Sequence, residues 1–150
     1  IGSVRKEISV NIRKNYEIKA KDIKNALRLR HATGTSLTAE VKSYGSPRIL
    51  QVFRVTMYKP SKKGYTKPPR ARVLKTSSMK IVKGMFVNKK GYLSQRTTRK
   101  RYPLRTPYGP SIPQMMESEK VIDVIKIKAQ DTLNKRFLHE IEYRFGKLGD

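Results

Sequence analysis

The chain has 150 residues, a formal net charge of +24, no cysteine and no tryptophan. This length predicts a single domain with a buried core, and the missing cysteines exclude disulfide bridges and thiolate-metal sites. The sequence has no apolar run near the roughly 18 residues of a membrane span and no signal-peptide pattern, so we expect no membrane association.

The positive charge lies outside the C-terminal segment. Residues 117–150 carry seven basic and seven acidic side chains, whereas residues 1–116 carry 28 basic and only four acidic ones. Between Val41 and Met116 there are 19 lysines and arginines and no carboxylate, where average usage would place about nine acidic residues. This imbalance indicates a polyanionic or strongly acidic partner.

The first segment has the pattern of an amphipathic helix over residues 3–16, because apolar residues recur every four positions between basic ones. Its narrow apolar stripe consists of Val4, Ile8, Ile12 and Tyr16. The stripe fits either the chain's own core or a neighbouring subunit, which makes Val4, Ile8 and Ile12 candidate subunit contacts. A second, short helix is expected over residues 22–27, with Asp22 as its N-cap.

The middle of the chain predicts strands. Residues 29–33 and 37–43 flank a Gly-Thr-Ser turn and alternate between apolar and polar residues, which indicates a hairpin. Residues 49–58 are rich in β-branched and aromatic side chains and predict the clearest strand. Shorter apolar pieces at residues 73–74, 81–82, 85–87 and 92–93 predict further strands.

Three strongly basic stretches interrupt these strands, at residues 59–72, 83–90 and 96–101, and we expect exposed loops. Their candidate contacts with DNA phosphates or with an acidic partner are Lys62, Lys63, Lys67, Arg70, Arg72, Lys83, Lys89, Lys90, Arg96, Arg99, Lys100 and Arg101. Basic residues also protect sheet edges and keep proteins soluble, but that role does not explain the missing carboxylates. Because no recognition helix is evident, the pattern favours phosphate contact without sequence readout.

Tyrosines are interleaved with the basic residues of this region, at Tyr58, Tyr65, Tyr92 and Tyr102. Aromatic rings of this kind can stack on nucleic-acid bases, and they can equally fill ordinary packing positions in strands. The sequence leaves both roles open.

A proline-rich connector separates the strands from the C-terminal helix. Its prolines, at positions 103, 107, 110 and 113, exclude an interior strand or a continuous helix. Ser111 and Gln114 stand three apart, as in a capping box, and Pro113 suits the first turn of the helix that follows. The connector therefore predicts a defined path ending in a helix start.

The last segment, residues 117–147, predicts one long helix with apolar residues every four positions from Val121 to Phe145. Because that spacing advances about 40° per step, one sheet cannot cover the whole stripe. We expect residues 121–133 on the sheet. Phe137, Leu138, Ile141 and Phe145 are then left for the N-terminal helix or a second subunit, and Phe137, Ile141 and Phe145 are candidate subunit contacts.

Catalytic signals are weak. His31 and His139 are each isolated, and no nucleophile motif or zinc-ligand spacing is present. The acidic residues of the last helix interleave with basic ones at helical spacing, which favours ion pairs within the helix over a metal site. We therefore expect no enzyme activity and no cofactor.

These elements predict an α+β fold in which a mainly antiparallel sheet packs against a long C-terminal helix, with an amphipathic helix at the N-terminus. We expect one domain over residues 1–150. Its parts are N-terminal helices over 1–28, a basic β region over 29–105, a proline-rich hinge over 106–116 and a C-terminal helix over 117–147.

The hinge also resembles a known family. The order Tyr-Gly-Pro then Pro-Gln-Met in residues 108–115, after Leu104-Arg105, is similar to the minor tail protein Z family of lambda-like tailed bacteriophages. The hinge residues that carry the resemblance are Arg105, Tyr108, Gly109, Pro110, Pro113 and Gln114. It extends to residues 139–143 and, more weakly, to residues 19–23, while only scattered positions such as Gly84 and Phe86 match between about residues 44 and 95.

The resemblance implies a virion structural protein that acts late in tail assembly, at the head-proximal end of the tail. It implies a tail-completion role, with the genome end positioned in the channel. The expected assembly is a ring, most simply a hexamer, in contact with tail terminator or neck ring proteins and, without sequence preference, with double-stranded DNA. The expected location is the virion tail, and the host cytoplasm during assembly.

Composition alone favours a different class, a free nucleic-acid-binding protein of ribosomal or nucleoid type. An acidic rim on an adjoining ring protein is a further target for the same basic loops. The sequence leaves these alternatives open beside the tail protein.

Overall fold

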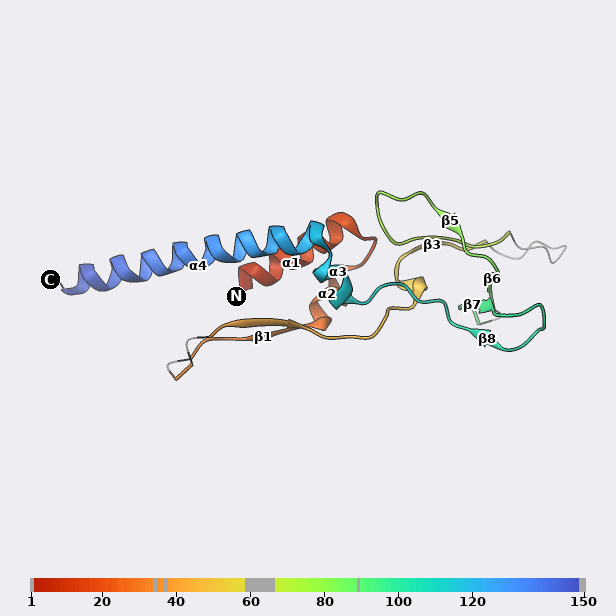
Figure 1. The fold of residues 1–150 in the computed structure, drawn as a ribbon, viewed down its shortest axis with the longest axis horizontal. Coiled ribbons are helices and arrows are strands. Elements are labelled where there is room, and N and C mark those ends of the chain that lie inside the picture. Colours follow the sequence, from red (N-terminus) through yellow and green to blue (C-terminus); the bar gives the residue numbers. More distant parts are fainter. Residues whose placement is uncertain (1, 34, 37, 59–66, 89, 149–150) are drawn as a thin grey trace.

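The computed structural model is an elongated molecule with the helices and one hairpin at one end and the remaining short strands at the other (Figure 1). It describes residues 2–33, 35–36, 38–58, 67–88 and 90–148. Every strand pair in the described part is antiparallel, and the longest helix is at the C-terminus. The predicted α+β class, with an N-terminal helix and a long C-terminal helix, is confirmed.

The N-terminal helix α1 (Gly2–Asn15) packs on the start of the C-terminal helix α4 (Glu119–Leu148). Ile8 and Ile12 of α1 are at most 1% exposed, and Val121 of α4 is fully buried. Val4 and Tyr16 pack at the edge of the same cluster. Ile8 and Ile12 therefore belong to the chain's own core and are not available for a subunit contact, whereas the half-buried Val4 stays a candidate.

The short helix α2 (Ala20–Ala26) begins earlier than predicted. Its N-cap is Lys19, and Asp22 lies inside the first turn, where a negative charge is favoured by the helix dipole. The predicted apolar side is confirmed, since Ile23, Ala26 and Leu27 are all buried. The chain then forms the predicted hairpin from β1 (Leu27–Arg30) and β2 (Glu40–Ser43).

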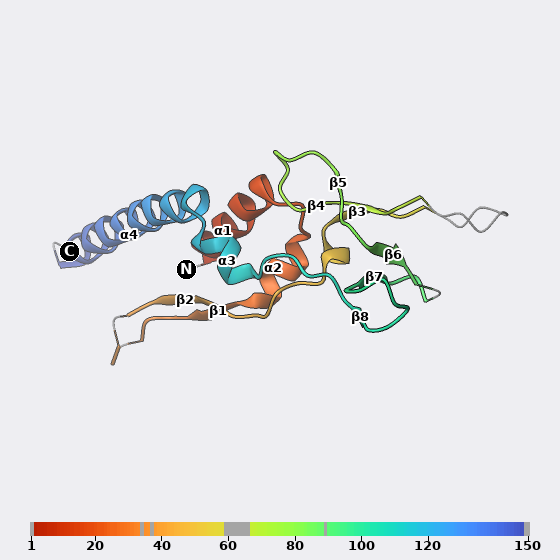
Figure 2. The ribbon, with the colours of Figure 1, turned by 45° about the vertical axis from the view of Figure 1, so that its right-hand side comes forward.

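The remaining strands form two three-stranded sheets at the other end of the molecule (Figure 2). The first sheet contains β3 (Arg54–Thr56), β4 (Arg70–Arg72) and β5 (Lys80–Ile81). The second contains β6 (Met85–Val87), β7 (Leu93–Arg96) and β8 (Leu104–Arg105). We call residues 49–108 the β lobe, and the helices together with the β1–β2 hairpin the helical lobe.

The strand predicted over residues 49–58 is much shorter in the structure. A 3-10 turn, η1 (Leu50–Val52), comes first, and β3 follows after Phe53. Leu50 and Phe53 are both buried. Because side chains three apart line up in a 3-10 turn, the turn directs both into the core, whereas a strand would point them to opposite faces.

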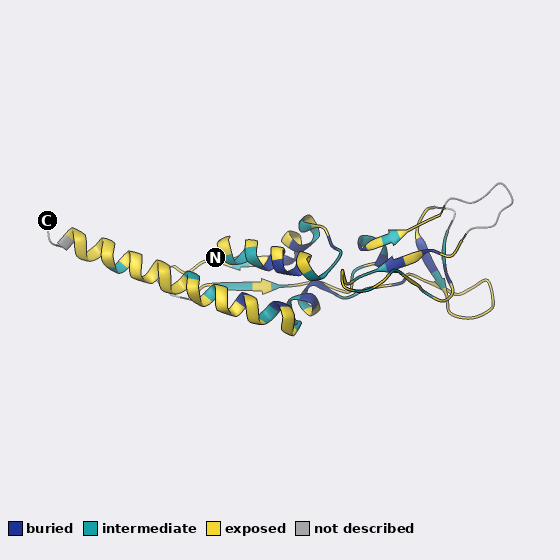
Figure 3. Cartoon of the chain, turned by 90° about the horizontal axis from the view of Figure 1, so that it is seen from above, coloured by how far each residue is buried: buried dark blue, intermediate teal, exposed yellow. Residues whose placement is uncertain are grey.

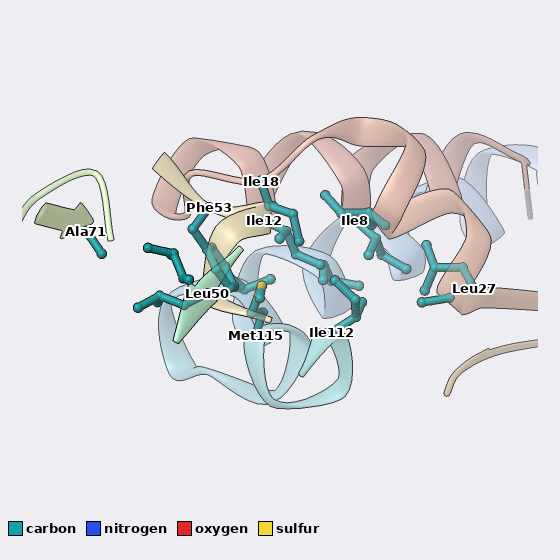
Figure 4. Packing of buried hydrophobic residues seen from close by; sticks show 14 of the residues in the cluster. Ile8, Ile12, Ile18, Leu27, Leu50, Phe53, Ala71, Ile112 and Met115 are labelled. Carbon is teal, nitrogen blue, oxygen red and sulfur yellow. The ribbon is translucent and has the colours of Figure 1, made fainter. Parts of the chain in front are cut away.

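A single hydrophobic cluster runs through both lobes. Figure 4 shows Ile8 and Ile12 of α1 facing Ile112 and Met115 of α3 (Ile112–Glu117). The β lobe extends the cluster through Leu50, Phe53, Ala71, Met85 and Leu93. The lobes are therefore packed together and share buried apolar surface.

The proline-rich connector ends in the predicted capping box. The Ser111 hydroxyl accepts a hydrogen bond from the Gln114 amide at 3.4 Å, and the Ser111 amide donates to Oε1 of Gln114 at 2.9 Å. The helix that follows is not continuous, however. Ser118 has extended backbone (φ −61°, ψ 134°) and separates α3 from α4, so the helix predicted from residue 117 begins at Glu119.

Replacement of Ser111 by alanine should lower the free energy of unfolding by about 1 kcal/mol, because the variant has no side-chain acceptor for the first turn of α3. Chemical denaturation at neutral pH measures this change. Ser46→Ala, in an exposed loop, is the matched control and should be close to neutral. Equal effects at the two serines would contradict a stabilising cap.

The second half of α4 leaves the body of the molecule (Figure 3). From Leu133 to Lys147 every residue is exposed except Ile141, which is half-buried. The prediction that residues 121–133 lie on the sheet is wrong in its detail. The first turns pack on α1, and Leu133 is solvent-exposed where α4 has left α1.

The chain enters and leaves the β lobe at one narrow neck. Ile49 and Tyr108 form an antiparallel bridge, the Leu50 amide donates to the Pro107 carbonyl, and the Gly109 amide donates to the Arg48 carbonyl, both at 2.8 Å. A second junction joins the α1–α2 linker to the residues after β4. There the Glu17 amide donates to the Val73 carbonyl at 2.8 Å.

Candidate nucleic-acid interface

The β lobe carries the charge imbalance that the sequence indicates. Residues 49–105 hold 17 lysines and arginines and no carboxylate. Figures 1 and 2 both place this lobe at the end of the molecule opposite the C-terminus of α4. The fold therefore collects the described parts of the three basic stretches at one end, away from helix α4.

The first basic stretch is only partly a loop. Lys62 and Lys63 lie outside the described residues, and Lys67 is exposed. Arg70 and Arg72 belong to β4, which pairs with β3, so the prediction of a loop up to residue 72 is wrong. Strand pairing places Arg70 and Arg72 on one face, since side chains alternate along a strand.

Arg72 has a partner within the chain. Its guanidinium binds the Glu17 carboxylate, which also lies 3.7 Å from Nη1 of Arg54. The Arg72 hydrogen bond holds the pKa of Glu17 below its ordinary value, and the charges of Arg72, Arg54 and Lys75 act in the same direction against the opposing effect of burial. Arg72 is therefore a structural cation here, and we remove it from the candidate phosphate contacts.

The second basic stretch is only partly a loop, because its residues 85–87 form β6, and a tight turn follows between β6 and β7. Oδ1 of Asn88 accepts hydrogen bonds from the amides of Lys90 and Tyr92, at 3.0 and 2.9 Å, and Gly91 has φ +81°. This conformation favours glycine and keeps Lys90 exposed at the turn. Lys83 is also exposed, and Lys89 lies outside the described residues.

The third basic stretch follows the end of β7. Arg96 ends that strand with its guanidinium 5.2 Å from the Phe86 ring, and Arg101 lies 5.7 Å from the Tyr102 ring. Arg99, Lys100 and Arg101 are all exposed in the loop to β8. These side chains are free to meet a phosphate backbone.

Three of the interleaved tyrosines are exposed: Tyr58, Tyr92 and Tyr102. Tyr65 lies outside the described residues. The ammonium of Lys67 is 5.9 Å from the Tyr58 ring, so a cation and an aromatic face stand together on this lobe. The sequence leaves two roles open for these tyrosines, stacking on bases and ordinary packing within strands. Because the three rings are exposed, they do not fill buried packing positions.

The hinge residues have structural roles. Tyr108 and Gly109 form the neck, Pro110 leads into the Ser111 cap, and Gln114 completes that cap. Pro113 occupies the first turn of α3, and Arg105 donates to Oε1 of Gln95 at 3.0 Å from the edge strand β8. Among the candidate subunit contacts on α4, Phe137 and Phe145 are exposed, and Ile141 is half-buried.

Arg54 also takes part in this electrostatic arrangement, although it is not among the candidates predicted from the sequence. Its side chain is 63% exposed, and it stands directly opposite Arg72 in the β3–β4 pair. Two facing arginines repel one another, which explains why a carboxylate is needed between them. The sequence signal for this arrangement was Glu17, because a carboxylate is rare here: only four of the first 116 residues are acidic.

The described residues hold no group of three or more His, Asp or Glu side chains able to bind a metal ion. His31 and His139 are both exposed. The one ion pair found in the described part of α4 joins Glu140 and Arg144 at 2.9 Å, at the predicted spacing of four. No described helix is both long and apolar enough to cross a bilayer.

Comparison of the chain with protein families, with curated proteins and with solved structures finds no match.

Proposed function

We propose that this protein is a phage virion structural component, a minor tail or tail-completion protein that forms a ring at the head-proximal end of the tail. The proposal rests on the resemblance of the hinge, residues 104–115, to minor tail protein Z. The observation that carries its mechanism is the β lobe, with 17 basic side chains and no acidic one.

In this proposal the β lobe faces the DNA channel and α4 points away from it. The two ends of the molecule differ in charge, because residues 117–150 carry seven basic and seven acidic side chains. A polyanion is therefore attracted more strongly to the β lobe than to α4. Copies arranged around an axis with their β lobes inward would line the lumen with lysine and arginine.

The function is electrostatic. Phosphate contacts through lysine and arginine depend on counterion release, carry no sequence information and let DNA slide. Such contacts suit a ring that must hold a genome end and still let it pass. The exposed tyrosines beside the basic side chains add faces for stacking where DNA strands open.

Replacement of Lys62, Lys63, Lys67 and Arg70 by glutamine should reduce the salt dependence of DNA binding. The slope of log affinity against log salt should fall by about 0.9 for each phosphate that the variant no longer neutralises. Fluorescence anisotropy with a short duplex at several salt concentrations measures it. The matched control neutralises four exposed lysines of the helical lobe, Lys14, Lys19, Lys21 and Lys24, and should leave the slope close to that of the unmodified protein.

Two other outcomes identify the alternatives. An unchanged slope together with failure of tails to join heads would assign the basic loops to an acidic rim on a neighbouring protein. Co-sedimentation of the native protein with ribosomes or chromosome, and not with virions, would replace the tail assignment by a free nucleic-acid-binding protein.

A further inference from the structure

Helix α4 has a second apolar stripe on the side that faces away from α1. We define this stripe by Val124, Ile127, Leu138, Ile141 and Phe145. On a helix that turns about 100° per residue these five side chains lie within about 100° of one another. Their common direction is about 130° from that of Val121 and Ile125, two buried residues at the end of α4 that packs on α1. The helix is therefore apolar on two separate sides.

The second stripe is open to solvent. Val124, Ile127, Leu138 and Phe145 are 43%, 65%, 58% and 70% exposed. The groove where α4 meets α1 and the β1–β2 hairpin is lined by other α4 residues, among them Ala129, Leu133 and Arg136. The second half of α4 also has no other element packed along it in the described structure (Figure 3). Because a helix in a protein gains most of its stability from packing, we expect another molecule to cover this half of α4.

The spacing of the stripe identifies the shape of that partner. Apolar residues separated alternately by three and four positions repeat every 3.5 residues, which is the pattern of a helix that winds around another helix. Two polar residues, Asp131 and Asn134, occupy the stripe positions halfway along it. A polar layer of this kind specifies alignment in helix pairs.

We propose that α4 binds α4 of a second copy of this chain in an antiparallel pair. With the two-fold axis between Thr132 and Leu133, Ile127 lies opposite Leu138 of the second copy, and Val124 lies opposite Ile141. The same alignment places Asp131 opposite Asn134, whose amide donates to the carboxylate. Every layer between Val124 and Ile141 then joins apolar with apolar or polar with polar.

The flanking charges fit the same alignment. Asp123 faces Arg144 of the second copy, and Lys135 lies beside Asp131 of the second copy. Lys128 and Lys135 approach one another along the same flank, with the two Asp131 carboxylates between them. A parallel pair would instead place Asp131 against Asp131, two like charges in a layer shielded from water.

This pairing is independent of the proposed tail function. A two-fold contact closes with two members, so it is separate from the head-to-tail contacts that a ring requires. The free, purified protein should therefore be a dimer or a multiple of one.

The first test is the state of association, measured by sedimentation velocity over a concentration series. Leu138→Glu should raise the dimer dissociation constant by about 100-fold or more, because the pair would bury two unpaired charges. Leu133→Glu is the matched control, since Leu133 is similarly exposed on the same helix but lies off the stripe. It should leave the dimer intact, and circular dichroism should show both variants folded.

An exchange of charges tests the predicted contact between Asp123 and Arg144 of the second copy. Asp123→Arg should weaken the dimer, because two arginines then face one another, and Asp123→Arg combined with Arg144→Asp should restore it. Restoration in the double variant is not expected from two unrelated surface changes.

The direction of the helices is measured with spin labels. The chain has no cysteine, so single cysteines at Leu133, Glu140 and Lys147 label one row of the helix. Distances between the two copies should increase by roughly 20 Å at each step away from the axis. Equal distances at all three positions, a protein that stays monomeric, or a dimer indifferent to Leu138→Glu would overturn the proposal.

Discussion

Gly109→Ala is expected to lower the free energy of unfolding by about 2–3 kcal/mol, because the added methyl group overlaps a neighbouring side chain. A Cβ at position 109 would lie 2.6 Å from Cε2 of Phe53 and 3.2 Å from two further ring atoms. Phe53 is buried in the shared core, so its ring has little room to move. The neck of the β lobe must then widen or the ring must leave its pocket.

The glycine is required for space alone, because its backbone is not in the left-handed region. Denaturant unfolding of Gly109→Ala with and without Phe53→Leu separates the two partners. The smaller leucine should relieve the contact, so the double variant should lose less than the sum of the single ones. Gly2→Ala, where a Cβ meets nothing within 4 Å, is the control. Simple additivity would contradict a steric contact.

Glu17→Gln should lower the free energy of unfolding by about 2 kcal/mol near neutral pH, because the charged hydrogen bond to Arg72 no longer forms. The change also leaves Arg54 and Arg72 facing one another without a carboxylate. The comparison is Glu40→Gln. Glu40 pairs with an exposed lysine, Lys42, so its replacement should change stability little.

The same pair predicts how stability depends on pH. The pKa of Glu17 is lower in the folded protein than its ordinary value of 4.5. The unfolded chain therefore takes up the proton first as pH falls, and the stabilisation is complete above about pH 4.5 and lost below it. The difference in unfolding free energy between the wild-type protein and Glu17→Gln should stay constant above about pH 6 and shrink toward about pH 3. A difference that does not depend on pH would contradict this linkage.

Features with a local cause were predictable from the sequence. The capping box depends on Ser111 and Gln114, which are three residues apart, and both are where the spacing indicates. The N-terminal helix and its buried stripe follow from a repeat of four, and the β1–β2 hairpin follows from alternation around a turn. Each of these signals lies within one element, so no knowledge of the tertiary structure was needed.

Features that depend on distant partners were not predictable. Arg72 and Glu17 are 55 positions apart, and nothing near either residue indicates the pair. The strand expected over residues 49–58 has high β propensity throughout, but burial of both Leu50 and Phe53 favours a 3-10 turn there. The α4 stripe of every fourth residue was recognised, but its sequence does not reveal that α1 covers the beginning of the helix and leaves the end uncovered.

For the basic end of the molecule, the sequence identified the residues and the structure gave their arrangement. The charge imbalance is a property of composition and was evident at once. Which lysines and arginines remain free depends on strand pairing and on one carboxylate from outside the lobe. This explains why Lys90, Arg99 and Arg101 remain candidates while Arg72 does not.

The neck at Ile49 and Tyr108 brings the two ends of a 60-residue excursion to the same place. Because the chain returns where it left, the length of the outer connections of this lobe is decoupled from the register of the helices on the other side. Insertions or deletions in those connections, away from the residues after β4 that pair with the α1–α2 linker, would alter how far the basic end of the lobe extends and leave the helical lobe unchanged. The helical lobe can therefore stay constant while the length of the β lobe varies.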